Sequence, residues 1–241
     1  MKKTHKQLVL SIEDEEGFEE WPLPAIVPVV FAEYKHKIEA ECYFGVYDIL
    51  RAFLLEYEKK LFTKEALLTL NDRLRPYFET QGYERLGGTL RFYRSFVLWN
   101  KKALRTDLIQ KDSLFLTREN RHIVKTNQTD FDLDELLSLG LPVCATVKDG
   151  ALVALATVNQ HSHGQRLLEA TVYTLPAYRG KGYGKSNVAL LCRLLLSQKK
   201  GIVYCCSCRN SASISLAKAV GFSQESRFYA VDAYRIEEGQ P

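Results

Sequence analysis

The chain has 241 residues, 26% of them charged, a formal net charge of +4 and a sequence pI near 8.6. These values are ordinary for a globular protein of one large domain or two small ones. The basic residues are spread along the chain, so nucleic-acid binding is not expected. No run of 18 apolar residues is present, so no membrane span is expected either. The apolar stretch Leu8–Ile12 is too short for a secretory signal, which predicts a cytoplasmic location.

The six cysteines are the first candidates for chemistry: Cys42, Cys144, Cys192, Cys205, Cys206 and Cys208. Cys205 and Cys208 spell C-x-x-C, but they lie in a β-like run where successive side chains point to opposite faces. No second C-x-x-C or His pair completes four ligands for zinc. The pattern favours small buried thiols in a reducing compartment, with no metal site.

The first 100 residues read as an extended segment followed by two helices. Residues 21–34 are apolar and contain three prolines, which predicts an extended, partly buried segment. Residues 46–61 carry apolar side chains at helical spacing. Thr63 can cap a second helix, and Pro76 is expected to end it. The two helices are predicted to form a hairpin with an apolar stripe that packs into a core.

A second region is expected to begin after a basic boundary segment, residues 100–106. Before it, the aromatic-rich residues 89–99 predict a strand. After it, residues 113–117 form a short strand candidate. Asp130 can cap a further helix that Gly140 closes. We interpret residues 1–106 as an N-terminal extension and residues 107–241 as a separate domain.

Three strands are expected next, joined by two tight turns. Asp149-Gly150 between apolar runs is a strong hairpin signal. A second turn is predicted at His161–Gln165, and it leads into a strand at residues 167–174. Pro176 stops this strand because proline has no N–H for the sheet ladder.

The stretch that organises the chain is the glycine-rich turn Arg179–Lys185 (RGKGYGK), placed between this strand and an apolar helix. Its glycines allow a tight turn and close approach of a ligand. The first N–H groups of the helix converge there, which predicts a site for an anion such as pyrophosphate. A plain loop with solvated Arg179, Lys181 and Lys185 is the alternative. The Rossmann pattern fails because the run is G-x-G-x-G, and the P-loop pattern fails because Arg179 stands where its first glycine belongs.

Two motifs in this order resemble the GNAT superfamily of N-acetyltransferases. Arg179 to Gly184 fits R-x-x-G-x-G, and Asn210 followed by a helix ending in Gly221-Phe222 is similar to the closing helix of that family. The resemblance covers roughly the last 130 residues. It implies an α+β fold with a mixed, mostly antiparallel, splayed sheet flanked by helices. It also implies acetyl-CoA as cofactor, a small-molecule or peptide amine as acceptor, direct transfer in a ternary complex, and it allows a homodimer.

The resemblance assigns site residues by position. The backbone of the strand would pair with the pantetheine arm, the glycine turn would hold the pyrophosphate, and Asn210 and Ser213 would contact the cofactor. The predicted cofactor-binding residues are Val172, Tyr173, Thr174, Arg179, Gly180, Lys181, Gly182, Tyr183, Gly184, Lys185, Asn210 and Ser213. Asn210 can also act simply as a helix cap.

The catalytic residues are less closely matched. Glu169 is the expected general base, although it lies one residue from the glutamate position of the family, and one residue moves a strand side chain to the other face. Ala217 replaces the usual tyrosine that protonates the leaving thiolate. Tyr173, then Tyr229 or Ser213, are the expected substitutes, with water as another option. The alternative function is a catalytically weak acyl-CoA-binding or sensory module, and the extension 1–106 is expected to cover the acceptor side.

Overall fold

The computed structural model describes residues 7–12, 25–57, 60–85, 92–159 and 166–234. The chain divides into two compact units, residues 1–94 with 226–241 and residues 95–225. Strands β5 (Phe92–Leu98) and β12 (Ser223–Tyr234) therefore each contribute residues to both units. The boundary expected from the sequence at residue 106 stays a prediction.

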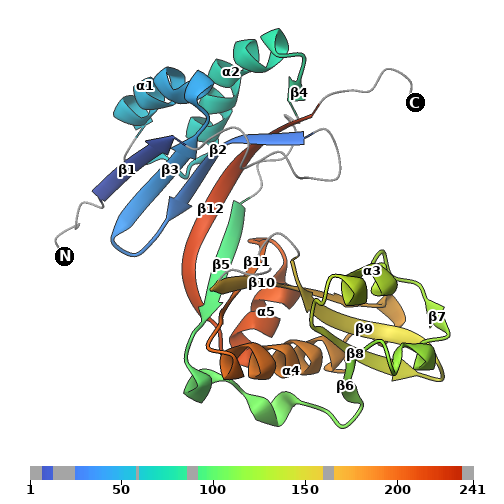
Figure 1. Ribbon diagram of the computed structural model, residues 1–241. Helices are drawn as coiled ribbons and strands as arrows, with labels where there is room; N and C mark the ends of the chain where they lie inside the picture. The colour runs from blue at the N-terminus through green and yellow to red at the C-terminus, as the bar shows by residue number, and fades with distance from the viewer. Residues whose placement is uncertain (1–6, 13–24, 58–59, 86–91, 160–165, 235–241) are drawn as a thin grey trace. The chain divides into compact units, whose positions relative to one another are not determined.

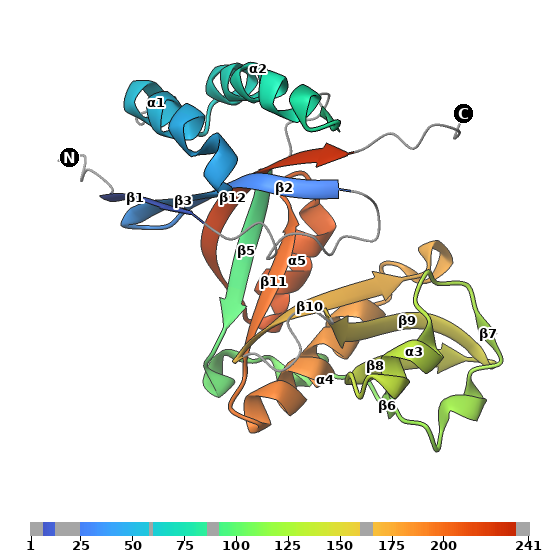
Figure 2. The ribbon, with the colours of Figure 1, turned by 45° about the horizontal axis from the view of Figure 1, so that its top comes forward.

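The first unit is a sheet with two helices on one face (Figures 1 and 2). The strand order is β1-β3-β2-β12, with β4 also pairing β12. β1 and β3 run parallel and the other pairs run antiparallel. Alternate strand residues, among them Phe31 and Tyr229, share one core with the helices. The elements are β1 (Gln7–Ile12), β2 (Ala25–Glu33), β3 (Lys37–Cys42), α1 (Tyr47–Tyr57), α2 (Lys64–Thr80) and β4 (Glu84–Arg85).

The predicted helix pair is confirmed, with one correction at the end of α2. Thr63 caps α2 as expected, because its hydroxyl accepts from the Ala66 N–H at 3.2 Å. Pro76, however, lies inside α2, which continues to Thr80. A proline inside a helix costs about 3 kcal/mol. Phe78, fully buried two residues later, anchors the continuation to the core, and Pro76 itself faces solvent.

The second unit contains a mixed, mostly antiparallel sheet in the order β5-β11-β10-β9-β8-β6, with β7 on β9. Helices α4 and α5 pack with one face of this sheet and α3 with the other. The predicted fold class is therefore confirmed. The remaining elements are β6 (Ser113–Leu116), β7 (Thr126–Asn127), α3 (Leu133–Ser138), β8 (Val143–Lys148), β9 (Ala151–Val158), β10 (Leu167–Thr174), α4 (Tyr183–Ser197), β11 (Gly201–Ser207) and α5 (Ser211–Val220).

The hairpin and the helix cap predicted for this unit are present, and the cap lies two residues later than expected. Asp149 and Gly150 turn between β8 and β9 with φ of 51° and 81°, which confirms the predicted hairpin. The cap of α3 is Asp132 and not Asp130, because the Asp132 carboxylate accepts from the N–H groups of Asp134 and Glu135. The turn expected at residues 161–165 lies outside the described residues.

All six cysteines are free thiols. Within the described ranges, no group of His, Cys, Asp and Glu side chains could hold a metal ion. The described part of the chain also contains no helix that is both long enough and apolar enough to cross a membrane.

Candidate functional site

The sheet of the second unit opens between β10 and β11. Within the described residues these parallel strands pair only from Leu167↔Gly201 to Glu169↔Val203, although both continue beyond this point. On its other edge β10 stays paired with β9 as far as Thr174. The Asn159 N–H donates to the Glu169 carbonyl at 2.8 Å, so the backbone groups of Glu169 face β9. Because these groups alternate along a strand, those of Val172 face the opening.

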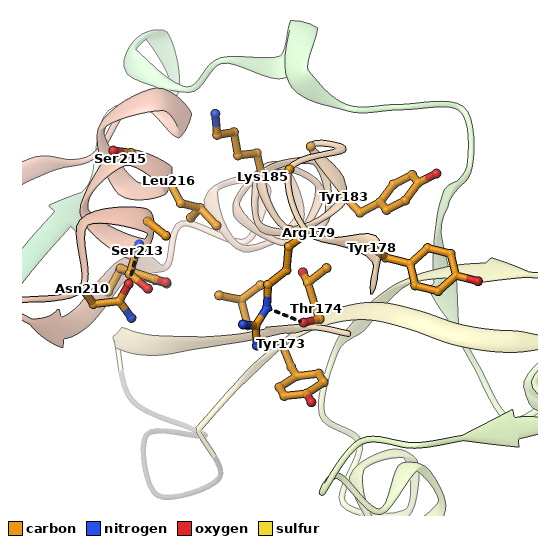
Figure 3. Close-up of a pocket in the computed structure, with 16 residues that line it drawn as sticks. Tyr173, Thr174, Tyr178, Arg179, Tyr183, Lys185, Asn210, Ser213, Ser215 and Leu216 are labelled. Atoms are coloured by element: carbon orange, nitrogen blue, oxygen red, sulfur yellow. Dashed lines mark hydrogen bonds between the residues drawn. The ribbon is translucent and has the colours of Figure 1, made fainter. Parts of the chain in front are cut away.

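The glycine-rich turn follows directly on β10. Gly180 and Gly182 have φ of 78° and 84°, a region that glycine adopts without strain. Gly182 precedes α4, and no side chain caps this end and no acidic residue lies in the first turn. The first N–H groups of α4 and its positive dipole end therefore suit an anion. Figure 3 shows Arg179 over β10, where its Nε donates to the Thr174 carbonyl at 3.2 Å.

A cavity of about 520 Å³ lies between the opening, the turn and α5 (Figure 3). All of the predicted cofactor-binding residues except Lys181 line it, and the Lys181 ammonium instead lies 4.8 Å from the centre of the Tyr178 ring. The close approach favours glycine at position 184, since a Cβ there would lie 3.1 Å from Thr174 Oγ1. The lining residues are Val172, Tyr173, Thr174, Tyr178, Arg179, Gly180, Gly182, Tyr183, Gly184, Lys185, Tyr204, Asn210, Ala212, Ser213, Ser215 and Leu216.

Sequence reasoning missed the residues that fix the turn. Ser186, fully buried in the first turns of α4, accepts from the Gln110 N–H at 2.7 Å and shares a hydrogen bond with the Ser113 hydroxyl at 2.6 Å. The Gln110 side-chain amide donates to the Lys181 carbonyl at 3.0 Å. The segment before β6 thus holds the glycine turn at Lys181 and the start of α4 at Ser186. Only the polar pair Ser186-Asn187 at the head of an apolar helix signals this in the sequence.

Asn187 holds α4 against the sheet. It is fully buried, accepts from the Thr146 hydroxyl at 3.2 Å and donates to the Ala154 carbonyl at 3.1 Å. A buried amide is stable only when such partners are present. The bonds to β8 and β9 therefore fix the position of the helix whose N-terminus lines the cavity.

Helix α5 supplies the opposite wall. Asn210 caps it, with its side-chain oxygen accepting from the Ser213 N–H at 3.0 Å, and it lines the cavity as well, so both expected roles are compatible (Figure 3). Tyr204 of β11 also lines the cavity and was not anticipated from the sequence. Its ring lies 6.0 Å from that of Phe222, and its hydroxyl hydrogen-bonds with Ser213.

The side chains of the two predicted catalytic residues point to the other face of β10, although Tyr173 is also among the residues that line the cavity. Leu168 and Ala170 belong to the core shared with α4, so Glu169 and Tyr173 alternate to the opposite face. Glu169 does not line the cavity; its carboxylate accepts from Asn159 at 3.4 Å and hydrogen-bonds with the Cys205 thiol. Burial, and then the charge of Glu169, raises the pKa of Cys205. The Tyr173 ring packs 6.5 Å from that of Phe131 and points away from α4 (Figure 3).

Comparison with known proteins gives a match to one family in sequence. The sequence model of the acetyltransferase (GNAT) family matches residues 109–222. A search of curated proteins found no match.

Among solved structures, three similar ones come from bacteria. A GNAT-family acetyltransferase from Novosphingobium aromaticivorans DSM 12444 is 14% identical, with TM-score 0.47 and coverage of 65% of this chain and 69% of that one. A GCN5-related N-acetyltransferase-like protein from Streptococcus suis 89/1591 is 17% identical, with TM-score 0.42 and 67% coverage of both. A GCN5-related N-acetyltransferase from Sphaerobacter thermophilus is 9% identical, with TM-score 0.45 and coverage of 88% and 81%.

The family match spans the segment from just before β6 to the end of α5, and so includes the opening, the glycine turn and the closing helix. Residues 109–222 therefore match the acetyltransferase (GNAT) family in sequence.

Proposed function

We propose that this protein transfers an acetyl group from acetyl-CoA to the primary amine of a small molecule or peptide. The single observation that carries the proposal is the cavity, in which an unpaired strand edge, a glycine turn at a helix N-terminus and the wall of α5 meet. These are the features that a long ligand with an amide-containing arm and a pyrophosphate requires.

The residues present fit such a cofactor. The backbone of Val172 would pair with the amides of the pantetheine arm, and the N–H groups at Tyr183, Gly184 and Lys185 would hold the pyrophosphate. Arg179 and Lys185 would add positive charge. A side chain at position 184 would obstruct this space, which explains the glycine there.

When bound, acetyl-CoA supplies an activated thioester, and the protein has to place an amine beside it and manage two protons. Glu169, on the face of β10 away from α4, stays the proposed acceptor for the amine proton. It would act on an amine that reaches the opening from that face. It also stays a prediction that the extension 1–106 covers the acceptor side.

Direct transfer in a ternary complex is favoured over an acyl-enzyme. No cysteine is among the residues that line the cavity. Cys205, the thiol closest in sequence to the opening, has its pKa raised by burial and by Glu169, so it would be a poor nucleophile. Ser213 and Ser215 line the cavity, and within the part of the chain that the structure describes no lining residue is a histidine that could activate them.

The proposal is tested by calorimetric titration with acetyl-CoA, followed by measurement of free-thiol release with a panel of small amines and peptides. We expect saturable binding and thiol release that depends on the amine. Release with buffer in place of the amine is the control for hydrolysis. Absence of both binding heat and thermal stabilisation by acetyl-CoA would refute the proposal.

An acyl-CoA-binding or sensory module is the second candidate, and two observations favour it: position 217 carries a buried alanine, and Glu169 lies outside the cavity. This candidate predicts the same binding of acetyl-CoA but no acetylated product with any amine. Mass spectrometry of the amine panel separates the two functions.

A further inference from the structure

Ala217 has no hydroxyl, so another group has to donate a proton to the sulfur of the departing CoA. The inference that follows rests on the proposed function. Ala217 is fully buried in the core shared by β10, β11, α4 and α5. Its methyl group cannot donate a proton or a hydrogen bond. A substitute has to lie in the cavity, on the helix side of the sheet, close to the point where the strands separate.

Tyr204 meets these requirements. It follows Val203, the last β11 residue that pairs with β10, so it lies where the opening begins. Its side chain shares the helix-side core with Ile202 and Cys206, and it lines the cavity with only 4% of its surface exposed. A phenol placed there has an apolar ring in the core and a hydroxyl available to the cavity.

The hydroxyl of Tyr204 is held by a second cavity residue. It hydrogen-bonds with the Ser213 side chain of α5, and both residues line the cavity. Burial raises the pKa of Tyr204, so its hydroxyl stays protonated at the pH where thiols ionise. The group is therefore a donor that persists over the pH range in which a thiolate would need it.

The other candidate tyrosines are oriented or engaged differently. Tyr173 points to the opposite face of β10 and packs on Phe131. The Tyr229 hydroxyl donates to Asn71 at 3.2 Å in the first unit. Tyr178 and Tyr183 lie beside Lys181 and Lys148, and Figure 3 shows both pointing away from Ser213.

We propose that Tyr204, oriented by Ser213, donates to the cofactor sulfur in place of the tyrosine that Ala217 replaces. The amine nitrogen bonds to the acetyl carbon and gives up one proton to the base. The carbon–sulfur bond breaks, and its electron pair stays on sulfur. The Tyr204 hydroxyl hydrogen-bonds to this sulfur and gives it a proton, and the phenolate regains a proton from water through the Ser213 hydroxyl. The products are an N-acetylamine and CoA with a free thiol.

The inference is tested by binding, with activity as a second measurement. CoA and desulfo-CoA, which lacks the sulfur, are titrated by calorimetry at pH 9, where much of a thiol is ionised. We expect the wild type to bind CoA about tenfold more tightly than desulfo-CoA, because a hydrogen bond to a charged acceptor is strong. Tyr204→Phe should remove this preference and leave the affinity for desulfo-CoA unchanged. With an active acceptor, kcat should fall by about 10² or more.

Controls separate failure of this inference from failure of the proposed function. Tyr178→Phe removes a lining hydroxyl at the turn and should keep the preference, while Ser213→Ala should reduce it in part. If Tyr204→Phe keeps the full preference, or if the wild type binds both molecules equally, Tyr204 is not the donor. If the wild type binds neither molecule, the proposed function fails and the inference fails with it. Thermal melts test whether Tyr204→Phe, which keeps the ring next to Phe222, stays folded as we expect.

Discussion

Alternation along β10 decides which side chains can meet the cavity. Val172 and Thr174 lie on the helix side and line it, and Glu169 lies on the other face with Asn159 and Cys205. The one-residue offset noted in the sequence is therefore a real difference in face. It means that a base at Glu169 would serve an acceptor that arrives from the side opposite α4.

Replacing Glu169 tests this assignment. If its carboxylate takes the amine proton, Glu169→Gln should keep the affinity for acetyl-CoA and lower kcat by about 10² to 10⁴. Steady-state kinetics with a confirmed acceptor, together with calorimetry, measure both quantities. Glu135→Gln on exposed α3 is the matched control and should leave both unchanged. An unchanged kcat in Glu169→Gln would reject the residue as base and leave it a structural partner of Asn159 and Cys205.

The residues that could be predicted are those whose role follows from local sequence. Asn210 precedes a helix and is its cap, and the glycines of the turn have positive φ or a close neighbour. Tyr204 could not be predicted, because its partner Ser213 comes from α5 and its place at the opening depends on the register of two strands. Such tertiary neighbours have no signature in a single sequence.

The ends of helices and turns could likewise be predicted only where they depend on residues adjacent in the sequence. The Asp149-Gly150 hairpin and the Thr63 cap depend on a few adjacent residues, and both are confirmed. Pro76 was expected to end α2, but burial of Phe78 beyond it outweighs the local cost. At α3, two aspartates two residues apart both fit a cap, and the one used is Asp132, which directly precedes the buried Leu133.

The element formed by β10, the glycine-rich turn and α4 should lose its affinity for acetyl-CoA when Gly184 is replaced by a larger residue. The Cβ of Gly184→Val would meet Thr174 Oγ1 at 3.1 Å and the side chains of Leu216 and Val172 at 3.5 and 3.6 Å. The added methyl groups would occupy the cavity, so acetyl-CoA affinity should fall at least about 100-fold by calorimetry, with the fold largely kept.

Gly184→Ala should have a smaller effect of the same sign, because it adds only the Cβ. Ser197→Val, at the exposed last residue of the same helix, adds a valine far from the turn and is the control. Unchanged affinity in Gly184→Val would show that the ligand does not enter between β10 and α5.

At the scale of the whole molecule, the chain passes between its two compact units twice, at residues 94/95 and 225/226. The boundary expected at residue 106 came from a basic, loop-like stretch, which is a local signal. The second unit includes residues 95–106, and three of their side chains, Phe96, Leu98 and Leu104, belong to its core. A boundary defined by core packing need not coincide with the nearest polar segment.

Fragments of the chain test where the acetyltransferase unit begins. Each large buried side chain lost from a core costs about 2–5 kcal/mol, and a domain has only about 5–15 kcal/mol in total. A fragment of residues 107–241 lacks Phe96, Leu98 and Leu104, so we expect it to unfold without a cooperative transition. A fragment of residues 95–225 keeps that core and should unfold cooperatively in urea and bind acetyl-CoA. Cooperative unfolding of 107–241 with full acetyl-CoA affinity would instead support the boundary at residue 106, because it would show that the cavity stands without the strand β5.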